Sequence, residues 1–210
     1  KSRMRNNWIL PLVSVLAIGI TGCSAESTKA ESAAQVSGLD QSAIAKPDAT
    51  TAAQIVIALD GEGLRLVNAE TGSTRLLAFG TDRVATETAL VAQLGPYDGR
   101  SSNDECGAGP IAFSHFGDFT VNFQEGLFVG WFLRNGDKNA TLTTMSGVGI
   151  GTKRSDMAKS VAFDMYGESS IGTEFHTGGD GPGGFSGLLE SDAADARITD
   201  LWAGTNCIFR

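Results

Sequence analysis

Short apolar runs separated by turn residues follow one another along the chain from residue 54 onward. Runs that are β-branched, or that alternate apolar and polar positions, predict strands. Residues 54–59, 63–67, 73–79, 111–116, 119–123, 127–133, 172–175, 185–189 and 197–203 meet this criterion. We expect antiparallel hairpins, with polar loops at residues 97–105 and 176–184.

Two helices are expected where an apolar stretch leads into Gly-Thr-x-Arg and then into helix-forming residues closed by a glycine. The first follows Thr81, the expected N-cap, and stops at Gly95. Its apolar face is expected to contain Val84, Leu90, Val91 and Leu94. The second is expected to end at Gly167 and to place Met157, Val161 and Met165 on one face.

These two helical segments occupy equivalent places in two similar stretches of chain. Each stretch continues into antiparallel strands with a late tryptophan, Trp131 in one and Trp202 in the other. We therefore predict an α+β fold of two tandem helix-plus-antiparallel-hairpin repeats, about residues 54–135 and 140–210, forming one sheet with the helices packed on one face. In repeat length and element order this prediction resembles the β-lactamase-inhibitor-protein fold and BamE-like outer-membrane lipoproteins.

Residues 1–22 have the pattern of a secretory signal, with a basic start and an apolar run too short for an ordinary membrane-spanning helix. The segment Ile20-Thr-Gly-Cys23 resembles the lipobox of bacterial lipoproteins, which implies that Cys23 becomes the acylated first residue. The alternative is a plain signal peptide followed by a chance cysteine. Ser24, because it is not Asp, implies sorting to the outer membrane, facing the periplasm, rather than to the inner membrane.

Residues 23–53 are rich in small and polar residues and poor in large apolar ones. Such a segment cannot bury enough apolar surface to offset its ordering entropy, so we expect a flexible tether. One globular domain is then expected over residues 54–210.

The remaining cysteines and the charge narrow the function classes. Cys106 and Cys207 form an even pair in a compartment that favours disulfides, so we expect a bridge; the alternative is two buried free thiols. The net charge is −8 before the basic leader is removed. That balance argues against nucleic-acid binding, which needs a basic face.

No familiar cofactor or metal motif is complete. The glycines of Gly147-Val-Gly-Ile-Gly151 lack the spacing of a dinucleotide site, so no nucleotide cofactor is expected. His115 and His176 belong to no zinc-binding pair, so no metal site is expected, and both are interpreted as surface or hydrogen-bonded histidines. No catalytic residue is predicted; a hydrolase would have to use carboxylates such as Asp180 and Glu190.

Two further groups of residues have a structural and a functional interpretation. The aromatic residues of the three central strands are expected to form core, the alternative being an exposed patch for a partner; they are Phe113, Phe116, Phe119, Phe123, Phe128, Trp131 and Phe132. Arg83 and Arg154 lie at equivalent positions of the two repeats, near a helix start. Each is expected to pair with a carboxylate or a strand carbonyl, the alternative being contact with a partner.

Residues 58–67 (ALDGEGLRLV), 105–110 (ECGAGP), 142–147 (LTTMSG) and 201–207 (LWAGTNC) resemble a family of uncharacterised proteobacterial lipoproteins, over about residues 55–210. Its members sometimes carry the name aspartate-semialdehyde dehydrogenase, but this chain shows no Rossmann unit, so the resemblance implies no activity. We expect a membrane-anchored periplasmic lipoprotein that binds an envelope protein or supports envelope assembly without catalysis. The alternatives are an inhibitor of an envelope enzyme and a hydrolase.

Overall fold

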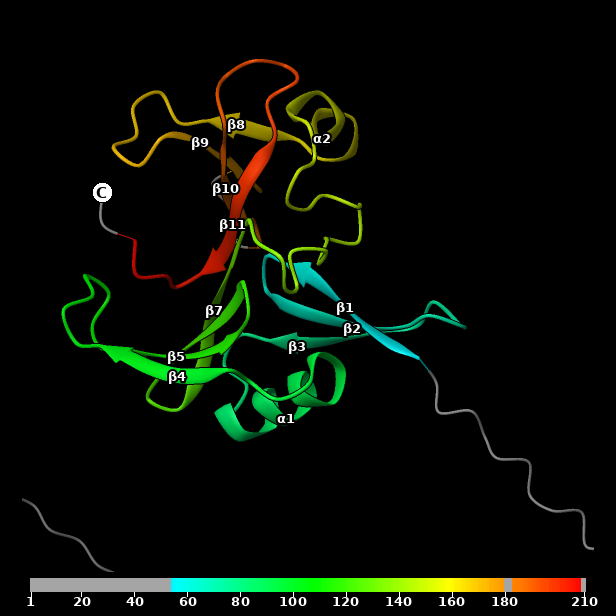
Figure 1. The fold of residues 1–210 in the computed structure, drawn as a ribbon, viewed down its shortest axis with the longest axis vertical. Helices are drawn as coiled ribbons and strands as arrows, with labels where there is room; N and C mark the ends of the chain where they lie inside the picture. Colours follow the sequence, from blue (N-terminus) through cyan, green and yellow to red (C-terminus); the bar gives the residue numbers. More distant parts are fainter. Residues whose placement is uncertain (1–53, 180–182, 209–210) are drawn as a thin grey trace, which may run out of the picture. The chain divides into compact units, whose positions relative to one another are not determined.

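The computed structural model describes residues 54–179 and 183–208 (Figure 1). Strands β1 (Ile55–Asp60), β2 (Gly63–Asn68) and β3 (Thr74–Ala78) form an antiparallel three-stranded sheet in chain order. Helix α1 (Arg83–Leu94) follows it. The predicted leader, Cys23, Ser24, the tether and Asp180 lie outside the described residues.

The remaining strands form one antiparallel eight-stranded sheet in the order β4-β5-β6-β7-β11-β10-β9-β8. They are β4 (Gly99–Asn103), β5 (Ile111–Phe116), β6 (Phe119–Gln124), β7 (Leu127–Arg134), β8 (Phe163–Met165), β9 (Thr173–Thr177), β10 (Ser186–Leu189) and β11 (Ile198–Gly204). Helix α2 (Arg154–Ser160) precedes β8. The fold is therefore α+β but mostly sheet.

The order of elements repeats within the larger sheet. Helix α1 is followed by the meander β4 to β7, and α2 is followed by β8 to β11. The last strands of the two series, β7 and β11, pair at the centre of the sheet. The prediction of a single sheet was wrong: β1, β2 and β3 pair with one another in a separate sheet, and their apolar side chains pack against the larger sheet in a shared core instead of extending it.

Both sheets and both helices share one hydrophobic core. Leu64 of β2, Leu90 of α1, Met157 of α2 and Trp131 of β7 are all fully buried in it. The indole Nε1 of Trp131 also donates a hydrogen bond to the backbone oxygen of Asp60, at 2.9 Å, which ties the two sheets together. The helices and the small sheet thus lie on one side of the eight-stranded sheet (Figure 1).

The aromatic residues divide between the two faces of the larger sheet. Five of them are buried in the core, as predicted: Phe116, Phe119, Phe123, Phe128 and Trp131. Phe113 and Phe132 are half-buried on the opposite face, because strand alternation directs every second side chain away from the core.

The first helix begins one residue later than predicted and turns a different side inward. Asp82 is the N-cap, and its Oδ1 accepts hydrogen bonds from the backbone N–H groups of Val84 and Ala85. Val84 is 70 % exposed, whereas Glu87 is buried. The predicted apolar face was therefore wrong at Val84 and at the exposed Val91, because a buried polar network at Glu87 fixes the rotation of the helix. Gly95 ends the helix as predicted.

The second helix is shorter than predicted. It ends at Ser160, and Val161 already has an extended backbone, with φ −149° and ψ 141°. Met165 lies in β8, which pairs with β9, so it does not share a helix face with Met157. Pairing with β9 gives this segment hydrogen bonds and lets Phe163 and Met165 pack against the core, which the helical periodicity alone did not reveal.

Two predicted loops contain strand residues. The segment 97–105 includes β4, an edge strand whose side chains are mostly exposed, so it has no apolar alternation that would mark it in the sequence. His176 and Thr177, expected in a loop, end β9. In the part of the chain that the structure describes, neither helix is long and apolar enough to cross a membrane.

Candidate functional site

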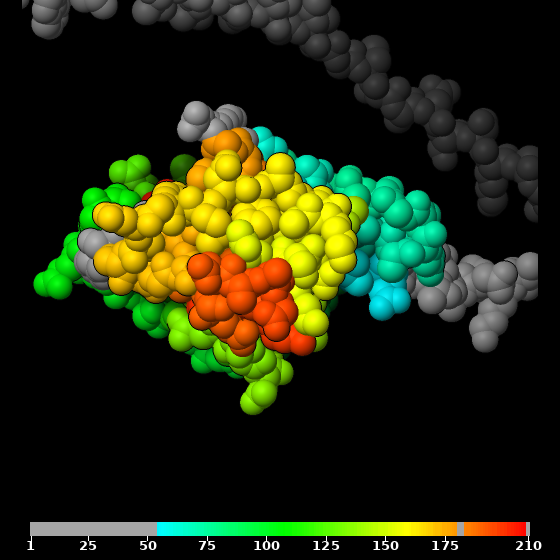
Figure 2. All heavy atoms as spheres, turned by 90° about the horizontal axis from the view of Figure 1, so that it is seen from above, coloured from blue at the N-terminus to red at the C-terminus, as the bar shows by residue number. Residues whose placement is uncertain are grey.

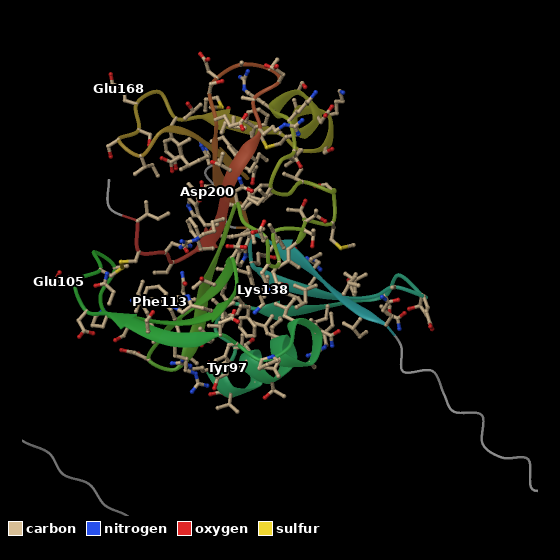
Figure 3. The ribbon with its side chains drawn as sticks, in the orientation of Figure 1. Tyr97, Glu105, Phe113, Lys138, Glu168 and Asp200 are labelled. Carbon is tan, nitrogen blue, oxygen red and sulfur yellow. A yellow bond between two sulfur atoms is a disulfide. The ribbon has the colours of Figure 1, made fainter. Side chains whose placement is uncertain are left out.

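The side of β4–β7 and β11 that faces away from the core is not covered by the helices or by the small sheet. Two rows of residues in register cross this side: Ser101, Phe113 and Asn122 in one row, and His115, Thr120, Phe132 and Trp202 in the other. Residues directly opposite in antiparallel pairs share a face. We call this surface the open face; Figure 3 shows Phe113 and Asp200 on this side of the sheet.

A cavity of about 310 Å³ lies on the open face. Side chains of β4 to β7 line one part of it, and the C-terminal segment, residues 205–208, contributes Asn206, Cys207 and Ile208. The aromatic rings in its wall are oriented by their neighbours. Phe132 stacks on Trp202 with 5.9 Å between the ring centroids and 9° between the planes. Phe113 stacks on His115 at 6.2 Å and 22°.

His115 is held in the cavity wall by two hydroxyls. Its Nε2 lies 2.8 Å from Ser101 Oγ, and its Nδ1 lies 3.2 Å from Thr120 Oγ1. A neutral imidazole donates from one nitrogen and accepts at the other. One hydroxyl therefore donates to the ring and the other accepts from it, and each keeps hydrogen-bonding capacity for a further group.

Asn122 connects the cavity wall to the C-terminal segment. It is 1 % exposed, and its Nδ2 donates to the backbone oxygen of Thr205 at 2.9 Å and to Asn206 Oδ1 at 2.8 Å. Its Oδ1 is buried and has no hydrogen-bond partner within residues 54–179 and 183–208. A buried acceptor without a partner costs about 1–3 kcal/mol, so this oxygen is an unusual feature of the wall that the fold by itself does not satisfy.

The C-terminal segment is fixed against the open face by covalent and steric means. Cys106 and Cys207 form a disulfide, with their Cα atoms 5.4 Å apart. Gly130, in the centre of β7, lets the backbone pass closely, since a Cβ there would lie 2.2 Å from the oxygen of Thr205. These contacts fix the C-terminal side of the cavity to the sheet.

The described lining of the cavity contains no carboxylate. Arg134 is its one arginine or lysine, and its Cζ lies 5.8 Å from the ring centroid of Phe132. Asp200 is directly opposite Arg134 in the β7–β11 pair, so a negative charge lies near this cation. The site is thus close to neutral and combines aromatic, hydroxyl and amide groups.

On the core side of the sheet, the predicted residue Arg83 belongs to a structural network. Its Nε donates to Glu87 Oε1 at 2.9 Å, and Ser114 and Arg100 also donate to this carboxylate. Burial raises the pKa of Glu87, but the hydrogen bonds from Ser114, Arg83 and Arg100 outweigh it, so the pKa is lowered. The pKa of Arg100 is raised, chiefly by its hydrogen bond to Glu87. The network joins α1 to β4 and β5.

The other predicted arginine, Arg154, donates from a terminal nitrogen to the backbone oxygen of Asp192 at 3.0 Å. It borders a hollow of about 1080 Å³ that also includes the exposed Glu190 and the 165–173 segment. Figure 2 shows this end of the molecule, with the orange-red surface of the segment around residue 192 beside the yellow surface of α2 and the residues around it. The two predicted arginines are therefore in different surroundings and do not form one site.

The remaining sequence candidates do not assemble into a catalytic or metal centre. His176 packs against Tyr166, with 4.8 Å between the ring centroids, far along the sheet from His115 in strand order. Within the described part of the chain, three carboxyls have clearly shifted pKa values, and each shift is downward: Glu87, Asp98 and Asp156. Among the described residues there is no group of three or more metal-ligating side chains.

Sequence reasoning missed most of the open face. Asn122, Trp202 and the C-terminal segment were not linked to a site, and Phe132 was expected in the core, with an exposed patch for a partner only as the alternative. One signal was present: Thr120 and Asn122 alternate with apolar neighbours in a strand otherwise read as core. A polar stripe on a central strand indicates that one of its faces is not packed against another apolar layer.

Comparison with known proteins gives no match for this chain, either to a protein-family model, to a curated protein or to a solved structure. The resemblances to lipoproteins and to tandem-repeat folds remain predictions, so the geometry of the open face carries the functional argument.

Proposed function

We propose that this protein is a non-catalytic binding module that holds its ligand on the open face of the eight-stranded sheet. The observation that carries the proposal is the cavity between β4–β7 and the C-terminal segment, whose wall contains the buried and unpaired Oδ1 of Asn122. Preformed apolar cavities with a few fixed polar groups are the usual form of ligand sites.

The proposed location is the periplasmic side of the outer membrane, with the acyl chains on Cys23 as the anchor. The sequence pattern before Cys23 supports it, and the Cys106–Cys207 disulfide is typical of proteins exported from the cytoplasm. Fatty-acid labelling followed by membrane fractionation tests this step. Wild type is expected to be labelled and membrane-bound, and Cys23→Ala unlabelled; equal labelling of both forms would contradict the assignment.

We further infer that the two halves of the sheet are tandem copies of one helix-plus-four-strand unit. The repeated element order and the central pairing of β7 with β11 support this inference. In such an arrangement a long sheet is built from two units that could not bury a core alone, and its uncovered side becomes a wide binding surface. An envelope protein, an enzyme to be inhibited and a small ligand would all use the same face.

Ligand binding is tested by nuclear magnetic resonance on the full chain carrying Cys23→Ala, labelled with ¹⁵N and with its disulfide formed. Mixtures of amino acids, short peptides, organic acids and sugars are added in turn. At least one mixture is expected to shift the amide signals of β4–β7 and of residues 205–208. If every mixture leaves these signals in place, or if the shifts gather elsewhere, the open face is not the ligand site.

One observation favours a second candidate, an esterase-like hydrolase. Ser101 Oγ lies within hydrogen-bond distance of His115 Nε2, as a nucleophile lies beside its base. The group on the other ring nitrogen, however, is the hydroxyl of Thr120 rather than a carboxylate. Loss of the orienting carboxylate lowers turnover about 10⁴-fold in serine proteases, so binding is the better supported function.

Hydrolysis of p-nitrophenyl acetate distinguishes the two candidates. The binding proposal expects wild type and Ser101→Ala to hydrolyse this ester at the same low rate. A rate that falls to background in Ser101→Ala, and that rises in wild type with deprotonation of a histidine, would instead establish the hydrolase.

A further inference from the structure

The cavity on the open face presents two kinds of surface side by side. Phe113 and Phe132 contribute flat apolar rings that are only half-buried. Each ring is held in a fixed plane by its stacking partner, His115 or Trp202. Next to these rings lie hydroxyl and amide groups from Ser101, Thr120 and Asn122. A ligand that fits must therefore have an apolar face and a polar edge.

The cavity wall retains both hydrogen-bond donors and hydrogen-bond acceptors that have no partner yet among the described residues. Of the two hydroxyls on His115, the one that accepts from the ring still has its own O–H to donate, and the other still has lone pairs to accept. Asn122 Oδ1 adds an acceptor. The guanidinium of Arg134 adds donors. Groups that both donate and accept, as alcohols do, match this set best.

Charge and size exclude several other ligand classes. Calcium, magnesium and amines would require carboxylates, and the described lining contains none; other metals would need several close ligands, and the described residues hold no group of three. A multiply charged phosphate would require several cations, whereas Arg134 stands alone in the lining and has Asp200 opposite it. A cavity of about 310 Å³ lies at the small end of the range for ligand sites and suits a single ring.

From these observations, and resting on the proposed function, we propose that the ligand of the open face is a pyranose, free or as one residue of a glycan. A pyranose has an apolar face of C–H groups and a rim of hydroxyls that each donate and accept. In the proposed complex the C–H face lies against the ring of Phe113. The hydroxyls bond Ser101, Thr120 and the unpaired oxygen of Asn122, which gains the partner that it lacks.

The test uses the ¹⁵N-labelled full chain with Cys23→Ala and three defined probes: methyl glucoside, methyl galactoside and methyl N-acetylglucosaminide. At least one is expected to shift the amide signals of β4–β7 with a dissociation constant of about 1 mM, as a ligand of this size reaches with modest efficiency. Phe113→Leu, which removes the aromatic plane but keeps apolar volume, is expected to weaken binding about tenfold.

Two further variants separate specific effects from loss of folding. Ser101→Ala removes one hydroxyl of the exposed edge strand and is expected to weaken binding about tenfold, as the loss of one neutral hydrogen bond does. Tyr97→Leu changes an aromatic residue that is outside the cavity lining and is expected to bind as tightly as the parent. The amide spectrum of each variant without ligand reports whether the fold is intact.

The outcomes distinguish this inference from the proposed function. If the glycosides leave the signals of β4–β7 unchanged but an organic acid or peptide shifts them, the pyranose inference fails and the binding site stands. Equal weakening by Phe113→Leu and Tyr97→Leu also overturns the pyranose inference. If no probe of any class shifts these signals, both proposals fail.

Discussion

The hydroxyl of Ser114, on β5, donates a buried hydrogen bond of 2.6 Å to the carboxylate of Glu87, on α1. Glu87 also receives hydrogen bonds from Arg83 and Arg100. The four residues come from a helix and two strands, so this network fixes the rotation and position of α1 on the sheet. It explains why a charged residue, rather than Val84 or Val91, occupies the inward side of the helix.

Replacing Ser114 should destabilise the protein through this contact. Ser114→Ala removes a hydrogen bond to a charged group, and we expect the free energy of unfolding to fall by about 1.5–3 kcal/mol in urea titrations. Ser102→Ala is the matched control, because Ser102 is exposed on the neighbouring strand, and it should change stability by less than about 0.5 kcal/mol. Similar small losses in both variants would show that the network contributes little.

The Glu87 carboxylate also predicts a pH dependence. Its pKa is lower in the folded chain than the value of about 4.3 expected when unfolded. The resulting stability is fully present above the unfolded pKa and is lost as the pH falls through the folded one. In urea titrations from neutral pH downward, the stability difference between wild type and Glu87→Gln should therefore narrow below about pH 4; a difference that stays constant would contradict the assignment.

The disulfide should contribute strongly to stability, because it links residues 101 positions apart in the sequence. In the chain-entropy model a loop of about this length stabilises by about 4–5 kcal/mol. The double variant Cys106→Ser, Cys207→Ser should lose much of this amount in chemical unfolding. Reductant should destabilise wild type and leave the double variant unchanged; an equal response of both would mean that the reductant acts elsewhere.

Close packing of the C-terminal segment on β7 can be tested at a single glycine. Gly130→Ala would place a Cβ 2.2 Å from the backbone oxygen of Thr205, so we expect a loss of about 1–3 kcal/mol, as for other overpacked sites. Gly99→Ala, in β4 of the same sheet, meets no atom within 4 Å and should be close to neutral. Thermal unfolding of both variants gives the comparison, and equal melting temperatures would show that the segment moves aside easily.

The pairing of strands shows how far the sequence pattern could lead. The three-stranded meanders β1–β2–β3 and β5–β6–β7 were predicted because their apolar runs are continuous and are separated by short turns. The edge strand β4 was missed because residues with few tertiary contacts leave no apolar pattern. β8 was taken for helix because Met157, Val161 and Met165 fit a helical period equally well.

The candidate site was less accessible to prediction than the fold. His115 was interpreted as a surface or hydrogen-bonded histidine, but its partners could not be named, since the hydroxyls of Ser101 and Thr120 reach it only across strand pairs. Asn122 meets residues 205 and 206 only because β6, β7 and β11 lie side by side. Such contacts between distant residues have no counterpart in local periodicity.

The sequence by itself determined where most strands lie, where the first helix stops and which two cysteines in the described domain are available to pair. These features follow from local chemistry: side-chain alternation, the conformational freedom of Gly95 and the count of thiols. Only the tertiary structure decided that β1–β3 form a second sheet and that Phe113 and Phe132 lie on the face of the larger sheet opposite the core. The physical reason is that alternation marks two faces on every strand, whereas the packing of other elements decides which face is covered and which remains to bind.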